Sequence, residues 1–354
     1  MHRAARVDRV SDVTTHPCTE SPFPSPSGSS GSAADPNGAA LRGSDPNGAA
    51  LLGRLGLPVR DLGELPASPQ RFPDGVAWRM EIPSVEGPGC VDAVLADAHE
   101  RAVPIRRMSQ GSGVFLHTDD ELDQMAAAAA AAGVELSLFA RPSAGWGLSA
   151  SARSAVGPLL APTAHGQGQL AAVLDDVLRA VEHGIRSVLV SDLGALAAAG
   201  QLKQSGDLPA DLTLKVSVML PAANAAAARV LEDLGAGTLN LPTDLSLGQI
   251  AAIRAAVDVP LDVYVEAPDN TGGFIRHHEI PDLVRVAAPV YLKFGLRNAP
   301  DVYPSGTHLE ATTVALSRER VRRARLGYEF MQRAGVDLHT SAPNAVGLAV
   351  PQLS

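Results

Sequence analysis

Residues 290–310, VYLKFGLRNAPDVYPSGTHLE, place Lys293 in the middle of an apolar strand pattern. An ammonium taken into a low-dielectric interior is costly unless it is paired. Glu266 ends the preceding strand pattern, so we expect its carboxylate to neutralise Lys293. Such a pair could transfer protons or let the lysine form an imine with a carbonyl compound. A static ion pair that closes the sheet is the alternative.

Other strand patterns also end in polar side chains, and parallel strands bring such ends to one edge of a sheet. We interpret Glu81 as a second carboxylate of a catalytic set with Glu266 and Lys293. Arg141 and Lys293 are candidate anchors for a substrate carboxylate. The remaining predicted substrate-binding residues at strand ends are Arg107, Asp192 and Asn240. Charges that come early in their strands are expected to form a structural network instead: Glu135, Lys215 and Asp262.

The loops after the last two strand patterns are rich in glycine and polar residues. Glycine N–H groups and an arginine often hold a phosphate at this position in a barrel, although glycine pairs also occur in plain turns. We therefore expect these loops to bind substrate, with phosphate or another anion as one interpretation. The predicted residues are Asp269, Asn270, Gly272 and Gly273 in the first loop, and Arg297, Asn298 and His308 in the second.

Eight short apolar patterns alternate with alanine-rich amphipathic segments, which is typical of βα units in a parallel sheet. Eight units close a barrel, so the sequence predicts an α/β protein with a single (β/α)8 TIM barrel. Within the strands, apolar residues alternate with charged ones, which predicts a barrel axis lined with charge. The strand patterns are VAWRMEI, VPIRRMS, VELSLFAR, IRSVLVSD, LKVSVML, GTLNLP, PLDVYVEA and VYLKFG.

The barrel is expected over residues 71–335, between a low-complexity N-terminal extension and a C-terminal tail over residues 336–354. Residues 1–70 are rich in Pro, Ser, Gly and Ala and contain the near-repeat DPNGAALRGS and DPNGAALLGR, so disorder is expected there. The loop over residues 141–168 is long and rich in Gly, Ser and Pro, and is a candidate lid over the site.

Composition excludes several classes of function. A net charge of -9 without a basic run argues against nucleic-acid binding. Two cysteines, Cys18 and Cys90, cannot form a four-cysteine zinc or iron–sulfur site. The adjacent histidines of HHE at 277–279 point to different helix faces, so no metal site is predicted.

The chain has no long apolar run and no secretory signal pattern, so we expect a cytoplasmic protein without a membrane partner. No nucleophile elbow, P-loop or dinucleotide fingerprint is present. The sequence leaves the cofactor and the oligomeric state unassigned.

The stretch 214–267 resembles the collagenase-like peptidases, family thirty-two of the peptidases with unassigned catalytic type. The matching features are Asn224 at a helix start, the Leu-Gly-Ala turn at 234–236 and Leu-Ser-Leu at 245–247. The resemblance implies a barrel and a peptidase-like hydrolase. Where the family has clustered cysteines, this chain reads PDNTGGFIRHH, so the resemblance transfers no catalytic residue.

Three functions follow from these observations. The resemblance favours a peptidase-like hydrolase acting on a small-molecule or peptide substrate. The small polar site favours a lyase, isomerase or aldolase acting on a carboxylated or phosphorylated metabolite. A solute-binding barrel without catalytic activity is the third.

Overall fold

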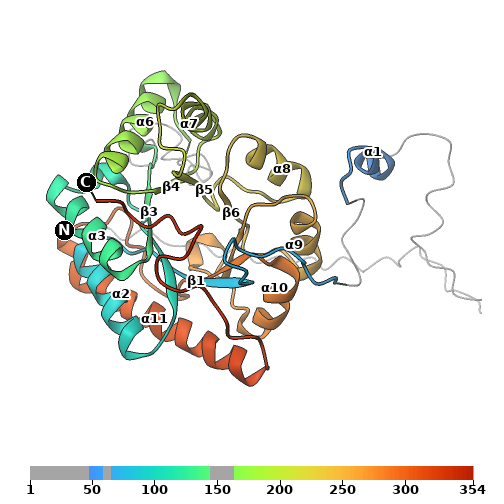
Figure 1. The fold of residues 1–354 in the computed structure, drawn as a ribbon. Coiled ribbons are helices and arrows are strands. Elements are labelled where there is room, and N and C mark those ends of the chain that lie inside the picture. The colour runs from blue at the N-terminus through green and yellow to red at the C-terminus, as the bar shows by residue number, and fades with distance from the viewer. Residues whose placement is uncertain (1–47, 59–64, 144–162, 354) are drawn as a thin grey trace, which may run out of the picture. The chain divides into compact units, whose positions relative to one another are not determined.

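The computed structural model describes residues 48–58, 65–143 and 163–353. Eight parallel strands close into a barrel in chain order, which confirms the predicted (β/α)8 fold (Figure 1). Each strand matches one predicted strand pattern, with one residue beyond the pattern at Pro83 and one at Thr213. They are β1 (Trp78–Pro83), β2 (Ile105–Ser109), β3 (Glu135–Phe139), β4 (Ser187–Val190), β5 (Thr213–Val216), β6 (Thr238–Asn240), β7 (Leu261–Glu266) and β8 (Val290–Phe294).

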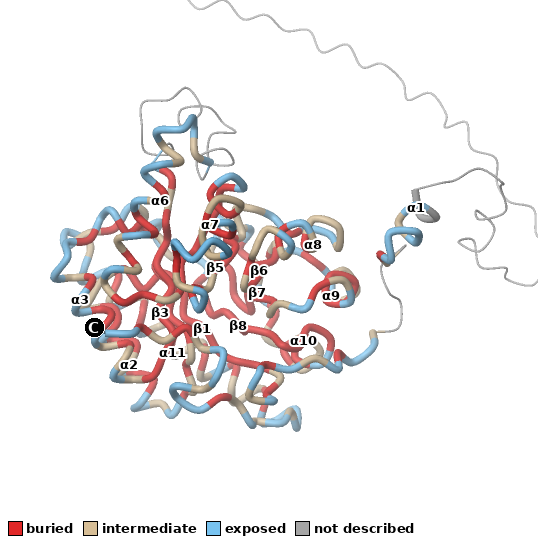
Figure 2. Tube along the Cα trace, turned by 45° about the horizontal axis from the view of Figure 1, so that its top comes forward, coloured by how far each residue is buried: buried red, intermediate tan, exposed pale blue. Residues whose placement is uncertain are grey.

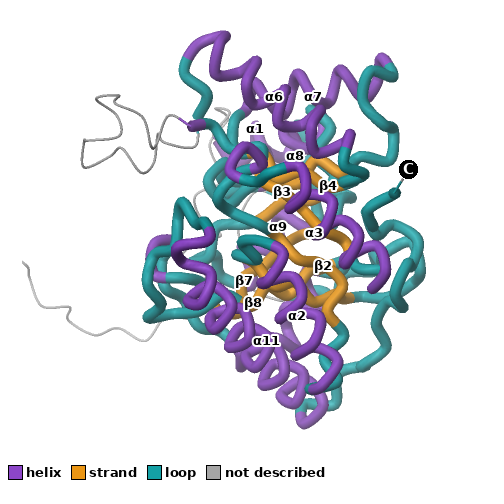
Figure 3. Tube along the Cα trace, turned by 90° about the vertical axis from the view of Figure 1, so that its left-hand side faces the viewer, coloured by secondary structure: helices purple, strands orange, loops and turns teal. Residues whose placement is uncertain are grey.

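A helix follows each strand and packs outside the barrel (Figure 3). The turn η5 (Thr307–Leu309) leads directly into the last helix, which begins at Glu310. The helices are α2 (Pro88–Glu100), α3 (Asp119–Ala132), α6 (Gly166–Glu182), α7 (Leu193–Ser205), α8 (Ala225–Asp233), α9 (Leu247–Arg254), α10 (Ile280–Ala287) and α11 (Glu310–Arg333). The short turns are η1 (Val114–Leu116), η3 (Asp269–Thr271) and η4 (His277–Glu279).

Local sequence sets several helix boundaries. α3 begins with a capping box, in which the Thr118 side chain accepts from the Glu121 N–H and the Glu121 side chain accepts from the Thr118 N–H. α3 ends at Gly133, whose φ of 63° is left-handed and therefore favours glycine. Ser246 and Gln249 form a second capping box at the start of α9. These caps fix where each helix starts relative to the strand before it.

The alternation within the strands separates two interiors. Outward-facing side chains such as Val263 and Leu292 join one apolar cluster with the helices. Seven inward-facing side chains are charged, and they are as completely buried as the apolar ones: Arg79, Glu81, Arg107, Glu135, Lys215, Asp262 and Lys293. Figure 2 shows the strands as the buried centre of the barrel. The predicted charged axis is therefore present.

Two predicted segments fall largely outside the described residues. Most of the low-complexity extension (1–70) and most of the candidate lid (141–168) are among them. In the described part of the extension, α1 (Gly48–Arg54) is helical. Ser68 is bonded beside α10, with its N–H donating to Arg285 O at 2.8 Å and its hydroxyl to Ala288 O at 2.6 Å.

The C-terminal residues run across the N-terminal end of the barrel. Arg79, at the start of β1, is completely buried, and its guanidinium donates to Ser341 Oγ at 2.7 Å, Val346 O at 3.0 Å and Gly347 O at 3.0 Å. Asp74 lies 3.4 Å from the same group. The segment therefore supplies most of the acceptors of a buried cation.

Removal of residues 337–354 should lower the free energy of unfolding by about 3 kcal/mol or more, because it strips partners from a buried charge. Urea unfolding followed by circular dichroism measures this. In an Arg79→Met background the same truncation should lower the free energy of unfolding much less. An equal cost in both backgrounds would show that the segment acts independently of Arg79.

Candidate active site

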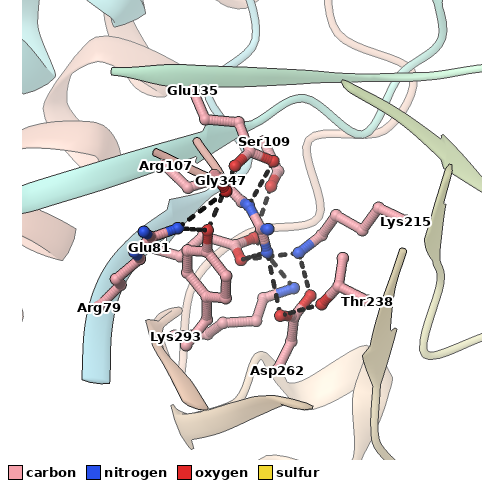
Figure 4. A network of polar contacts seen from close by, with 11 residues as sticks. Arg79, Glu81, Arg107, Ser109, Glu135, Lys215, Thr238, Asp262, Lys293 and Gly347 are labelled. Atoms are coloured by element: carbon pink, nitrogen blue, oxygen red, sulfur yellow. Dashed lines mark hydrogen bonds and ion pairs between the residues drawn. The ribbon is translucent and has the colours of Figure 1, made fainter. Parts of the chain in front are cut away.

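A network of ion pairs fills the middle of the barrel, and Glu81 lies at its centre (Figure 4). One carboxylate oxygen, Oε2, accepts from Lys215 at 2.7 Å and Arg107 at 3.3 Å. The other, Oε1, accepts from the Ser109 hydroxyl at 2.5 Å and lies 3.2 Å from Lys293 Nζ. Three cations from β2, β5 and β8 therefore share one carboxylate from β1.

Asp262 and Glu135 complete the network. Asp262 accepts from Lys215, from Arg107 at 3.0 Å and from Thr238 at 2.6 Å. Glu135 accepts from Arg107 Nε at 2.7 Å. The predicted structural network of Glu135, Lys215 and Asp262 is thus present. Arg107, predicted to bind substrate, belongs to it as well.

The network sets the protonation of its members. Burial by itself raises the pKa of Glu81, but the charges of Lys215, Lys293 and Arg107 outweigh it and hold the pKa well below its usual range. Burial lowers the pKa of Lys215 to about 8, and repulsion from Arg107 adds to this. Glu81 is therefore ionised at neutral pH and is a weak base.

A cavity of about 270 Å³ opens above this network, at the C-terminal ends of the strands. This is where barrel enzymes of known function place their active sites. Its polar lining residues include Ser84, Ser109, Arg141, Asn240, Tyr264, Asn270, Lys293, Asp301 and Tyr303. The structure therefore brings four of the predicted site residues together at one cavity: Lys293, Arg141, Asn240 and Asn270.

Lys293 links the charge network to the cavity. Its side chain is only 2% exposed, and Nζ lies 4.4 Å from the centre of the Tyr264 ring. Among the described residues Glu81 is its one ionic partner, so two of the three ammonium N–H donors face no other carboxylate. The chain contains only three lysines, the others being Lys203 and Lys215.

The predicted ion pair between Glu266 and Lys293 is wrong. The register of β7 against β8 shifts between Tyr264 and Glu266, so that Tyr264 pairs with Lys293 but Glu266 pairs with Phe294. Phe294 belongs to the outer apolar cluster. Because of this irregularity, Glu266 leaves the inward-facing set that regular alternation predicts.

Its carboxylate instead faces the loop after β8 and helix α11. It accepts from the Arg297 N–H at 2.9 Å and lies 3.5 Å from Arg323 Nε. Glu81 takes its place as the partner of Lys293. Glu266 and Glu81, the two carboxylates of the predicted catalytic set, are not among the cavity-lining residues.

The predicted anion site in the late loops is filled by the chain's own carboxylate. Asp269 lies 3.2 Å from Arg297 Nε and accepts from the Asn298 N–H. Gly272 and Gly273 have φ values of 105° and 59°, and they end the turn η3. Of this loop, Asn270 reaches the cavity lining.

Two other predicted residues also lie away from the cavity lining. Asp192 caps α7, where its side chain accepts from the Ala195 N–H at 2.8 Å. His308 lies in η5, the turn before α11, and is exposed. Both belong to helix starts rather than to the cavity.

Several cavity residues were not identified from the sequence. Ser109 and Tyr264 lie on the same strand faces as Arg107 and Asp262, so the strand alternation was a usable signal. No sequence signal pointed to Tyr303, because it belongs to the irregular loop after β8. Its ring packs against Gly111, where an added Cβ would come within 2.5 Å of it.

The described residues contain neither a group of metal ligands nor a membrane-spanning helix. No three His, Cys, Asp or Glu side chains there are grouped so that they could hold a metal ion. None of the described helices combines the length and apolar character needed to cross a membrane.

Comparison with known families confirms the resemblance seen in the sequence. Residues 159–267 match the model of peptidase family U32. The match spans α6 to β7, under a third of the chain, and includes four of the eight barrel strands, β4 to β7. Comparison with curated proteins gives no match.

Several solved structures are similar to this chain at low identity. The YdjI aldolase from Escherichia coli K12 is 15% identical, with 72% of this chain and 91% of that chain covered and a TM-score of 0.44. The putative copper homeostasis protein CutC from Streptococcus agalactiae is 14% identical, with 61% and 98% covered and a TM-score of 0.41. The U32 peptidase Mk0906 is 14% identical, with 66% and 98% covered and a TM-score of 0.37. At these scores the likenesses do not bear on the chemistry of the site.

The depressed pKa of Glu81 predicts a pH-dependent part of the stability. A carboxylate whose folded pKa is lowered contributes stability above its unfolded pKa, about 4.3, and loses that contribution as the pH falls towards the folded value. The stability difference between the wild type and Glu81→Gln should therefore stay constant from pH 7 to 5 and shrink below about pH 4. Urea unfolding at each pH measures it. A difference that does not change down to pH 3 would contradict the assignment.

Proposed function

We propose that this barrel is an enzyme that acts on the carbonyl group of a small anionic metabolite, as a lyase or isomerase. The observation that carries the proposal is Lys293, a buried amine that faces the cavity and shares its carboxylate with two other cations. An ion pair that only stabilises the fold does not need to face a cavity, whereas a group that reacts with substrate must face one.

The size and charge of the cavity support a small acidic substrate. Its volume of about 270 Å³ lies below the range of typical ligand pockets, so a metabolite fits better than a peptide. Among the described residues, its lining carries two cations, Lys293 and Arg141, and one carboxylate, Asp301. Arg141 also donates to Gly111 O at 3.1 Å, which holds its guanidinium at the wall. The excess of positive charge favours a carboxylate or phosphate.

Lys293 can serve such a substrate in two ways. As an ammonium, it donates a hydrogen bond to the oxygen on which negative charge develops when a bond beside the carbonyl breaks. As a neutral amine, it adds to the carbonyl carbon, and loss of water gives an imine that accepts the electrons of the breaking bond. Water then releases the product and restores the amine. Ser109, which lines the cavity and donates to the same Glu81 oxygen, is the candidate for proton transfer.

Reduction with borohydride in the presence of pyruvate should trap the imine on Lys293, seen as a mass gain on its peptide. Only Lys203 and Lys215 could form the adduct in its place, and Lys215 does not line the cavity. The mass of the modified peptide therefore identifies the lysine that reacts. Lys203→Arg is the matched control and should leave the adduct unchanged. Lys293→Arg removes the imine but keeps the charge.

The two roles of Lys293 give different results. If a panel of 2-oxo acids yields no adduct on Lys293 and Lys293→Arg keeps turnover, the amine acts through its charge alone. If Lys293→Met turns over substrate as fast as the wild type, the proposal is wrong. Ligand-induced thermal stabilisation without any turnover would support a solute-binding barrel instead.

A peptidase-like hydrolase is the second candidate, and the match of residues 159–267 to peptidase family U32 favours it. The group best placed for it is Ser109, whose hydroxyl lines the cavity and donates to Glu81. We rank it second because Glu81, with its pKa held low, is a weak base for activating a hydroxyl.

Ser109→Ala separates the candidates. If Ser109 is the nucleophile, cleavage of small amides and peptides should fall by about a thousandfold or more, whereas imine trapping on Lys293 persists. Ser205→Ala, at an exposed hydroxyl that donates to Asp207, is the matched control. Hydrolysis that survives in Ser109→Ala would remove the serine from this role.

A further inference from the structure

Arg320 is a buried cation behind the wall of the cavity. It lies on α11, its side chain is 5% exposed, and its Nη1 donates to Ser84 O at 3.1 Å. Its Nε is buried and has no hydrogen-bond partner among the described residues. A guanidinium carries five N–H donors, so most of its capacity is unused.

No carboxylate of the described residues forms an ion pair with Arg320. Burial lowers the pKa of Arg320, and the nearby Tyr303 and Glu86 only partly oppose this through space. The carboxylate of Glu86 is itself directed at Gly111 and Ser112, accepting from their N–H groups at 2.8 and 3.1 Å and from the Ser112 hydroxyl at 2.5 Å. A buried charge without a close counter-ion is costly, which indicates a partner that comes from outside the chain.

A single residue, Ser84, separates this guanidinium from the cavity. Ser84, whose carbonyl accepts from Arg320, lines the cavity, and so does Tyr303. The Tyr303 hydroxyl donates to Ser84 Oγ, so Tyr303 and Arg320 both contact Ser84, one at its hydroxyl and one at its carbonyl. Tyr303 belongs to the loop between β8 and α11, which is held at Ser305 by a 2.8 Å bond to Ser112.

We propose that Arg320 is a second anion-binding group of the active site, covered by Tyr303 in the free protein. When Tyr303 leaves Ser84, a carboxylate or phosphate of the substrate pairs with the guanidinium. This inference rests on the proposed function and deepens it. With Arg141 at one wall and Arg320 at another, the site selects a carbonyl compound that carries two acidic groups.

Calorimetric titration with 2-oxoglutarate and with pyruvate tests this substrate class. The wild type should bind 2-oxoglutarate more tightly, and Arg320→Gln should raise its Kd by about tenfold or more while leaving that of pyruvate nearly unchanged. Arg333→Gln, on the same helix and 65% exposed, is the matched control and should change neither. Inorganic phosphate as a third probe separates a phosphate site from a carboxylate site.

Tyr303→Ala supplies an independent readout. Removing the cover should tighten binding of 2-oxoglutarate or phosphate, and the gain should vanish in the double variant with Arg320→Gln. If Arg320→Gln does not fold, the test rests on Tyr303→Ala alone. The inference is then overturned if Tyr303→Ala binds 2-oxoglutarate and phosphate no more tightly than the wild type. A wild type that prefers no two-acid probe and no phosphate, or a preference that survives in Arg320→Gln, also overturns it.

Borohydride trapping keeps this result separate from the proposed function. If the wild type forms the adduct on Lys293 but shows no preference for two-acid compounds, only the role of Arg320 is wrong. If Arg320→Gln loses the preference and no protein forms an adduct, the anion site stands and imine chemistry is wrong.

Discussion

The sharing of the Glu81 carboxylate by Arg107, Lys215 and Lys293 is the interaction on which the rest of the site depends. In most barrels branched apolar side chains fill the axis, whereas here ionic groups from six strands do so. Such an interior is stable only if every charge has a partner at hydrogen-bond distance. This requirement fixes the side-chain positions in the floor of the cavity.

The same carboxylate organises the chemistry above it. Ser109 and Lys293 meet on Oε1, so a hydroxyl and an amine from different strands are held side by side at the cavity. Lys215 and Arg107 meet on Oε2 and are not among the cavity-lining residues. One carboxylate thus separates the cations that stabilise the barrel from the one that can meet a substrate. Positioning by a buried partner is how a long, flexible lysine side chain is given one geometry.

Helix α11 ties the outer layer to the site. Its Arg323 lies beside Glu266, the carboxylate that the irregularity in β7 turns away from the axis. One turn earlier, Arg320 reaches the back of the cavity wall. The helix therefore contributes one arginine to holding the top of the barrel together and one to the proposed binding of substrate.

The sequence by itself determined the barrel, the order of its strands and the charged axis, because these follow from patterns that repeat every two or three to four residues. It also placed Lys293, Arg141, Asn240 and Asn270 at strand ends and loops that meet. Only the tertiary structure decided which charges pair. A one-residue irregularity in β7 moved Glu266 to the outer face. No local sequence pattern predicts such a change of strand register.

Tyr303 and Arg320 likewise reach the site through loop and helix packing, since residues far apart in the chain become neighbours only when the barrel closes.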